Sequence, residues 1–388
     1  MGSIGLPDKD SADIYLVVAT RDELLTQQQA NSDEWRGVLP AEAYVRRETY
    51  LYSQELTRDG GMTPWVLVHQ PDPKGPRQIL CGCESIRKRA LVARDGQIED
   101  VISHGVCSVF CSPDKRGRGY AGRMMKEMAQ RMEHWQLDNG KSSPFSILYS
   151  DIGKDFYALR GWQAFPSAHV SVPALATTTP ADVRLLKNED IAELCALDEK
   201  LVRQKLYKLK TSNRTTVAIV PDHATIAWHH ARDDFVANEL YGKTPSVKGI
   251  MVGDRPGSRI WMYFTRVWTY LQEDCPNTLH ILRLVIEDES LLDFSPASSA
   301  DADKLEGTDV VRAIAACLQV AQSEAALWDM KDVTIWNPTS ATLAAARSLD
   351  PKAAVVEREH ESIASLNWYG SGSVTDIDWV CNEKYGWC

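Results

Sequence analysis

The sequence predicts an α/β protein made of two successive units. Over the first 170 residues, short runs rich in β-branched residues alternate with amphipathic stretches of helical spacing. Residues 174–181 (ALATTTPA) are small and polar and contain proline, which is typical of a linker, and the alternation resumes beyond them. A chain of 388 residues is also longer than one typical domain. We therefore expect a first domain at 10–172, a linker at 173–182 and a second α/β domain at 183–388.

The first unit contains the clearer pattern of elements. Apolar runs predict strands at 14–20, 64–69, 79–93, 101–112, 145–150 and 162–172. Helical spacing predicts helices at 21–35, 41–57, 119–137 and 154–159. The longest helix carries its methionines along one stripe, and this spacing indicates a face packed in the core. These residues are Met124, Met125, Met128 and Met132.

The second unit repeats this alternation with weaker boundaries. Helices are expected at 183–209, 310–330 and 340–349, and strands at 216–220, 249–252, 259–265, 279–285 and 333–336. The polar stretch 295–306 predicts an exposed loop.

The charge, the apolar runs and the cysteine spacing of the chain indicate which kinds of partner it lacks. The chain has 43 basic and 53 acidic residues, a net charge of −10, which does not favour a general nucleic-acid binder. Residues 1–10 lack the apolar segment of a secretory signal, and no apolar run reaches the roughly 18 residues of a membrane span. The nine cysteines follow neither a disulfide framework nor a metal-ligand spacing. We expect a cytoplasmic, reduced protein with no nucleic-acid partner, no membrane partner and no metal.

The most informative stretch is 109–126, VFCSPDKRGRGYAGRMMK. A predicted strand reaches Pro113, and a loop rich in arginine and glycine then opens the long helix. Backbone N–H groups at a helix N-terminus bind phosphate oxygens, and Arg116, Arg118 and Arg123 add positive charge for an anionic ligand. Neither G-x-G-x-x-G after the first strand nor G-K-[ST] is present, which excludes the Rossmann and P-loop motifs.

This R-x-x-G-x-A loop, preceded by a V-x-C strand, resembles the acetyl-CoA-binding motif of the GNAT acetyltransferase family. Tyr157, followed four residues later by Gly161 and then by Trp162, resembles the second signature of that family. The resemblance covers about residues 10–172 and implies a GNAT (acyl-CoA N-acyltransferase) fold with acetyl-CoA as cosubstrate. The second domain would then be α/β, and one form of it would be a degenerate GNAT-like unit without the phosphate loop. The resemblance implies that the cofactor is bound by Val109, Phe110, Cys111, Arg116, Gly117, Arg118, Gly119, Tyr120, Ala121 and Arg123.

The chain as a whole resembles a subgroup, the fungal L-lysine N6-acetyltransferase-like proteins. The phrases HGVCSVF, LYSDIGKDFYALRGW and TIAWHHARDDF carry this resemblance. It implies a small primary amine as acceptor, with the side-chain amine of L-lysine as the first expectation. A natural-product amine and protein lysines remain open as acceptors. An acyl-CoA-responsive binding protein without turnover remains open as a different class.

The expected chemistry requires an acid and a base. A lysine-type amine has a pKa of about 10.4, so its neutral form costs about 4.6 kcal/mol at pH 7 and a base must accept the proton. The resemblance implies that Tyr157 protonates the leaving thiolate and that the splayed strand at 109–111 supplies N–H donors to the thioester oxygen. Gly105 stands where many family members have a glutamate, so the base stays open between His104 and Glu84.

Two further features point to the acceptor pocket. His229 and His230 are candidates for contact with the acceptor. The aromatic C-terminal segment predicts that Trp387 packs between the domains, because such residues are seldom left in solvent. Some two-domain GNAT proteins direct a C-terminal carboxylate into the site. By that resemblance the carboxylate of Cys388 would lie near Tyr157 and supply the missing base. The sequence does not predict the oligomeric state.

Overall fold

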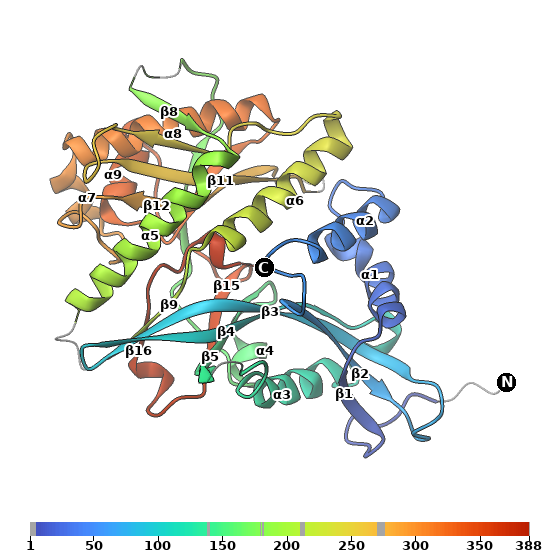
Figure 1. Ribbon diagram of the computed structural model, residues 1–388. Helices are drawn as coiled ribbons and strands as arrows, with labels where there is room; N and C mark the ends of the chain where they lie inside the picture. The colour runs from blue at the N-terminus through green and yellow to red at the C-terminus, as the bar shows by residue number, and fades with distance from the viewer. Residues whose placement is uncertain are drawn as a thin grey trace.

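The computed structural model describes residues 5–137, 140–178, 180, 182–209, 214–269 and 276–387. Two mixed sheets lie one above the other, with helices α5 (Asn188–Lys208) and α6 (His223–Tyr241) between them (Figure 1). This arrangement confirms the predicted α/β class.

The first sheet is built mainly from the N-terminal part of the chain. Its strands run in the order β1 (Ile14–Val18), β2 (Met62–His69), β3 (Gln78–Arg94), β4 (Gln97–Phe110), β5 (Phe145–Ser150), β15 (Ile363–Trp368) and β6 (Gln163–Ala164). β4 and β5 are parallel, whereas the other neighbours in this order are antiparallel. The long β3–β4 hairpin turns at Asp95-Gly96, where both residues have positive φ (50° and 75°), as a tight hairpin turn requires.

Helices cover both faces of this sheet. α1 (Arg21–Trp35) begins with a capping box between Thr20 and Glu23, and α2 (Ala41–Tyr52) follows it. α3 (Tyr120–Met132) lies on one face, and its methionine stripe is fully buried, so the predicted core face is confirmed (Figure 1). α4 (Asp155–Ala158) is the short helix that carries Tyr157.

The second sheet belongs to the C-terminal part of the chain. Its strands run in the order β14 (Val356–Glu357), β7 (Ala168–Pro173), β13 (Asp332–Trp336), β12 (Thr278–Ile286), β11 (Ile260–Val267), β10 (Gly249–Val252) and β8 (Val183–Leu186). Helices α7 (Ser299–Leu305), α8 (Asp309–Leu327) and α9 (Ser340–Leu349) complete this half. α8 has the length and composition of a membrane-spanning helix, but Ile314 and Leu318 are fully buried in the core of this half.

Several sequence predictions differ from the structure. Residues 183–209 begin with strand β8 before the helix, the expected loop at 295–306 contains α7, and residues 162–172 divide between β6 and β7. More importantly, β7 pairs in the second sheet, while β15 pairs with β5 in the first. β9 (Thr215–Ile219) also joins the first sheet by pairing with β3, and β16 (Ile377–Trp379) pairs with β9. The expected linker at 173–182 therefore does not separate the two sheets.

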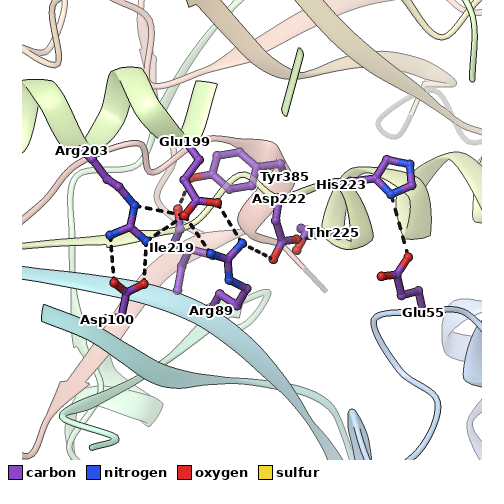
Figure 2. A network of polar contacts seen from close by, with 10 residues as sticks. All are labelled: Glu55, Arg89, Asp100, Glu199, Arg203, Ile219, Asp222, His223, Thr225 and Tyr385. Atoms are coloured by element: carbon purple, nitrogen blue, oxygen red, sulfur yellow. Dashed lines mark hydrogen bonds and ion pairs between the residues drawn. The ribbon is translucent and has the colours of Figure 1, made fainter. Parts of the chain in front are cut away.

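Ion pairs connect helices α5 and α6 to the β3–β4 hairpin of the first sheet. Arg203 of α5 contacts Asp100 of β4 at 2.6 Å and Glu199 at 2.7 Å, and Glu199 contacts Arg89 of β3 at 2.8 Å (Figure 2). Arg89 also lies 3.8 Å from Asp222, the N-cap of α6. Single surface pairs contribute little to stability, but a connected set fixes how α5 and α6 sit on the hairpin.

Candidate active site

The first feature of the site is the separation of β4 from β5. The two parallel strands pair only from Ser103–Gly105 of β4 to Phe145–Ile147 of β5, and β4 then continues to Phe110 without pairing with β5. The strand edge beyond Gly105 therefore keeps backbone groups that β5 does not satisfy. Such groups are available to a ligand inserted between the strands.

A β-bulge lies next to this gap. Glu84 pairs with Cys107 and Gly82 pairs with Phe110, so the two residues after Cys107 oppose one residue of β3. Ser108 has a φ of +54°, which is uncommon for a residue other than glycine. Its hydroxyl donates to the Glu84 carboxylate at 2.7 Å. Bulges re-aim backbone groups and occur often beside active sites, which fits the predicted donor role of residues 109–111.

The glycine-rich loop is open to solvent. Residues 116–119 are exposed, and Gly117 and Gly119 have φ values of +75° and +85°. A Cβ at Gly117 would meet no atom within 4 Å. Gly119 is the N-cap of α3, so the free N–H groups at the start of this helix lie behind an accessible loop. These features fit a phosphate-bearing ligand such as coenzyme A.

The side chains around the loop differ in their contacts and exposure. The Arg116 guanidinium donates to the Cys111 carbonyl at 2.9 Å and pairs with Glu34 at 2.6 Å. Phe110 is buried, with its ring 6.0 Å from that of Trp35. Burial raises the pKa of the Cys111 thiol, which keeps it protonated and disfavours a nucleophilic role. Val109 and Ala121 are partly exposed, and Arg118 is exposed.

Two residues expected to bind the cofactor hold the N-terminal segment instead. The Tyr120 hydroxyl donates to the Pro7 carbonyl at 2.5 Å, and the Tyr120 side chain is buried. The Arg123 guanidinium donates to the carbonyls of Ser11 (2.8 Å) and Ile14 (2.7 Å). The polar groups of these two side chains are thus occupied, and the binding of the cofactor by Tyr120 and Arg123 stays a prediction.

Tyr157 and Glu84 lie on opposite faces of the first sheet. Tyr157 packs with Cys83 and Val106 on the face covered by α3. Glu84 alternates with Cys83 along β3 and therefore points to the other face. There its charge contributes to raising the pKa of Tyr44 and Tyr52 on α2, although burial is the larger cause. The Tyr157 hydroxyl and the Glu84 carboxylate thus lie on opposite sides of the sheet, and Glu84 accepts from Ser108 in the part of β4 that does not pair with β5.

His104 has an interior position on the α3 face. Its Nε2 lies 3.2 Å from the Gln136 Oε1 and its Nδ1 lies 3.4 Å from the Ser143 Oγ. Burial lowers the pKa of His104 to about 4, so the ring is neutral at pH 7. With both nitrogens occupied and no exposed surface, His104 is a poor base, and Glu84 is the stronger of the two candidates.

The adjacent histidines of α6 point to different places. The Nε2 of His229 lies 3.0 Å from the Tyr385 carbonyl, and the His229 ring lies 6.3 Å from that of Trp387. Burial lowers the pKa of His229 to about 3. His230 instead lines a cavity of about 190 Å³ together with Tyr50 and Asp234. The two candidates therefore do not form one acceptor pocket.

Trp387 packs between the two halves, as the aromatic C-terminal segment predicted. It contacts a cluster that contains Met62 and Ile86 of the first sheet and Trp228 of α6. Cys388, whose carboxylate is a candidate base, lies outside the described residues. Sequence analysis did not identify Ser108, because its contact with Glu84 depends on the bulge.

Comparisons with known proteins agree with this geometry. The family model described as the LYC1 GNAT-like C-terminal domain matches residues 169–388. A lysine acetyltransferase of Yarrowia lipolytica is 22% identical over 309 residues, which cover 69% of this chain and 77% of that protein. An uncharacterised protein of Saccharomyces cerevisiae is 22% identical over 245 residues, which cover 54% of this chain and 61% of that protein.

Solved structures show the same fold. A GCN5-related N-acetyltransferase from Anabaena variabilis has a TM-score of 0.50 at 13% identity and covers 92% of this chain and 73% of its own. Saccharomyces cerevisiae N-myristoyltransferase has a TM-score of 0.51 at 10% identity and covers 95% of this chain and 80% of its own. The predicted GNAT fold is thus confirmed, and the family match covers more than half of the chain. The chain belongs to the LYC1-like family of GNAT acetyltransferases and is an acyltransferase enzyme.

Proposed function

We propose that the protein transfers the acetyl group of acetyl-CoA to the side-chain amine of L-lysine. The observation that carries the proposal is the gap between β4 and β5, with Glu84 bound to Ser108 in the unpaired part of β4 and Tyr157 on the opposite face of the sheet. The printed name of the Yarrowia lipolytica relative supports lysine as the acceptor.

The open loop at 116–119 would hold the pyrophosphate of the cosubstrate, with its thioester in the gap. N–H groups of the bulged strand would stabilise the negative charge that develops on the thioester oxygen. Glu84, directly or through a water, would accept a proton from the acceptor ammonium. The neutral amine would then form the new C–N bond as the C–S bond breaks.

Tyr157 has the properties of the acid in this reaction. Burial raises the pKa of its hydroxyl, so the group stays protonated at neutral pH. Within the described part of the chain, no residue forms a hydrogen bond with this hydroxyl. It is therefore available to donate its proton to the departing thiolate.

The test is an acceptor screen that measures free CoA. L-lysine, other primary amines of the same length and a lysine-containing peptide would each be supplied with acetyl-CoA. The proposal predicts the highest kcat/KM for free L-lysine. A higher kcat/KM for the peptide or for an unrelated amine would mean that L-lysine is not the acceptor. Tight binding of acetyl-CoA with no CoA release for any amine would instead indicate a binding protein.

The carboxylate of Cys388 remains a second candidate for the base. Trp387 makes it worth testing, since this ring packs in the cluster that also contains Ile86, two residues from Glu84. Deletion of residues 387–388 and addition of a short polar extension would both move that carboxylate. If both variants keep wild-type kcat/KM, Cys388 has no part in the reaction.

A further inference from the structure

One buried cation between the two halves lacks the partner that similar cations have. Arg283 pairs with Asp198 at 2.7 Å, Arg266 pairs with Asp233 at 3.0 Å, and all of these side chains are buried. Lys88 of β3 is only 2% exposed, yet its Nζ has no hydrogen-bond partner among the described residues. An uncompensated charge in such a place is costly, so Lys88 indicates a missing anion.

Two other unsatisfied donors belong to the same region. Ser103 pairs with Lys88 across the β3–β4 ladder, so the two side chains lie on one face of the sheet. The Ser103 Oγ and the Trp228 Nε1 are also buried without a partner in the described part of the chain. Trp228 belongs to α6 and packs against Ile86, which precedes Lys88 by two residues on the same face.

Arg232 adds a second positive charge. It lies one helical turn after Trp228 and thus on the same side of α6. Its guanidinium lies 5.7 Å from the centre of the Trp387 ring and forms no hydrogen bond or ion pair with any residue that the structure describes. Lys88 and Arg232 both lower the pKa of His229, in addition to the larger effect of burial, so both lie near that ring.

The unsatisfied groups share one chemical property. An ammonium and an indole N–H only donate hydrogen bonds, and a hydroxyl can donate one. A carboxylate only accepts hydrogen bonds and carries the opposite charge, so it complements this set. We propose that Lys88, Ser103, Trp228 and Arg232 bind the α-carboxylate of the acceptor, which would therefore be an amino acid with a free carboxylate.

This inference rests on the proposed function, and the spacing along β3 agrees with it. Glu84 and Lys88 are four residues apart on one strand, which places their Cα atoms about 13 Å apart. In extended L-lysine about 7 Å separates the carboxylate from the side-chain amine. The side chains of Glu84 and Lys88 span the remaining distance, so the amine would reach the gap while the carboxylate meets Lys88.

The experiment compares acceptors that differ only in the carboxylate. We expect kcat/KM for lysinamide and for 1,5-diaminopentane to be at least 100-fold lower than for L-lysine, mainly through KM. In Lys88→Met, L-lysine should lose this advantage, so that its kcat/KM approaches that of 1,5-diaminopentane. Lys200→Met, which changes an exposed lysine of α5, is the matched control and should behave like the wild type.

Each result separates the two proposals. If the wild type acetylates amines but does not prefer those with a carboxylate, the carboxylate site is wrong and amine acetylation stands. If it acetylates no amine, the proposed function itself fails. The wild-type series decides the question even if Lys88→Met does not fold.

The carboxylate could also come from the protein itself, at residue 388. An extension of two residues, Gly-Ser, after Cys388 would move that group. If the extension and Lys88→Met lower turnover of L-lysine and 1,5-diaminopentane equally, the site binds a carboxylate of the chain, and its assignment to the acceptor is overturned.

Discussion

Replacement of Tyr157 by phenylalanine tests the proposed acid most directly. The change removes one hydroxyl that has no hydrogen-bond partner among the described residues, and the ring keeps its place in the cluster around Cys83 and Val106. Because no partner is left unsatisfied, the free energy of unfolding should change by less than about 1 kcal/mol. The fold and the affinity for acetyl-CoA should therefore persist.

The effect on turnover should be large and independent of pH over the range of the assay. Loss of a positioned acid lowers the rate by roughly 10²–10⁴-fold, which corresponds to about 3–5 kcal/mol of transition-state stabilisation. Burial raises the pKa of the Tyr157 hydroxyl, so the acid stays protonated as the pH rises from 7 to 9.5. The deficit of Tyr157→Phe should therefore stay constant over this range.

The assay is release of free CoA at saturating L-lysine, measured across this pH range. Tyr263→Phe, which removes a buried hydroxyl from the second sheet, serves as the control and should keep kcat per folded molecule. A wild-type kcat in Tyr157→Phe would refute the acid role. A deficit that disappears towards pH 9.5 would show that the hydroxyl acts in some other way.

Three further changes test other parts of the site. Gly119→Glu should lower the affinity for acetyl-CoA, measured by calorimetry, at least 100-fold, because the new carboxylate repels the phosphates. Gly257→Glu changes an exposed glycine with a φ of +92° and should leave this affinity unchanged. Equal affinities of the two variants would contradict the loop assignment. Glu84→Gln should lower kcat by at least 100-fold and remove the acid limb of the kcat/KM profile, and an unchanged limb would exclude this base. His104 has a folded pKa of about 4 against 6.5 when free, so unfolding takes up a proton between these values and stability should fall as the pH drops from 6.5 to 4. In His104→Gln, the Tm from thermal melts should fall less steeply as the pH drops from 6.5 to 4. An equal dependence of Tm on pH in the variant and the wild type would argue against a neutral buried ring.

The sequence predicted the local structure around the candidate site well. The strand, loop and helix around residues 109–126 depend on neighbouring residues, since glycine at positions 117 and 119 permits the left-handed backbone and the methionine spacing defines the buried face of α3. Tyr157 also lies on the short helix that its contiguous pattern predicted, and its role stays a prediction.

The predictions that failed concern pairing between strands that are far apart in the sequence. β7, β9 and β15 each have the composition of an ordinary strand, and nothing in a strand's own residues states which sheet it joins. For the same reason the roles of His104 and Lys88 could not be read from the sequence. These residues lie on opposite faces of one sheet, and their surroundings come from α3 and from α6.

The exchange of strands between the halves has a consequence for synthesis of the protein. β5 obtains its neighbour on the side away from β4 only when residues 363–368 are available, and the hairpin of β3 and β4 gains β9 only after residue 215. During translation, the motif-bearing half would emerge with two bare strand edges, which favour pairing with other chains. We therefore expect that a nascent or prematurely terminated chain has no transferase activity of its own, and that chaperones protect it until the last strands have been added.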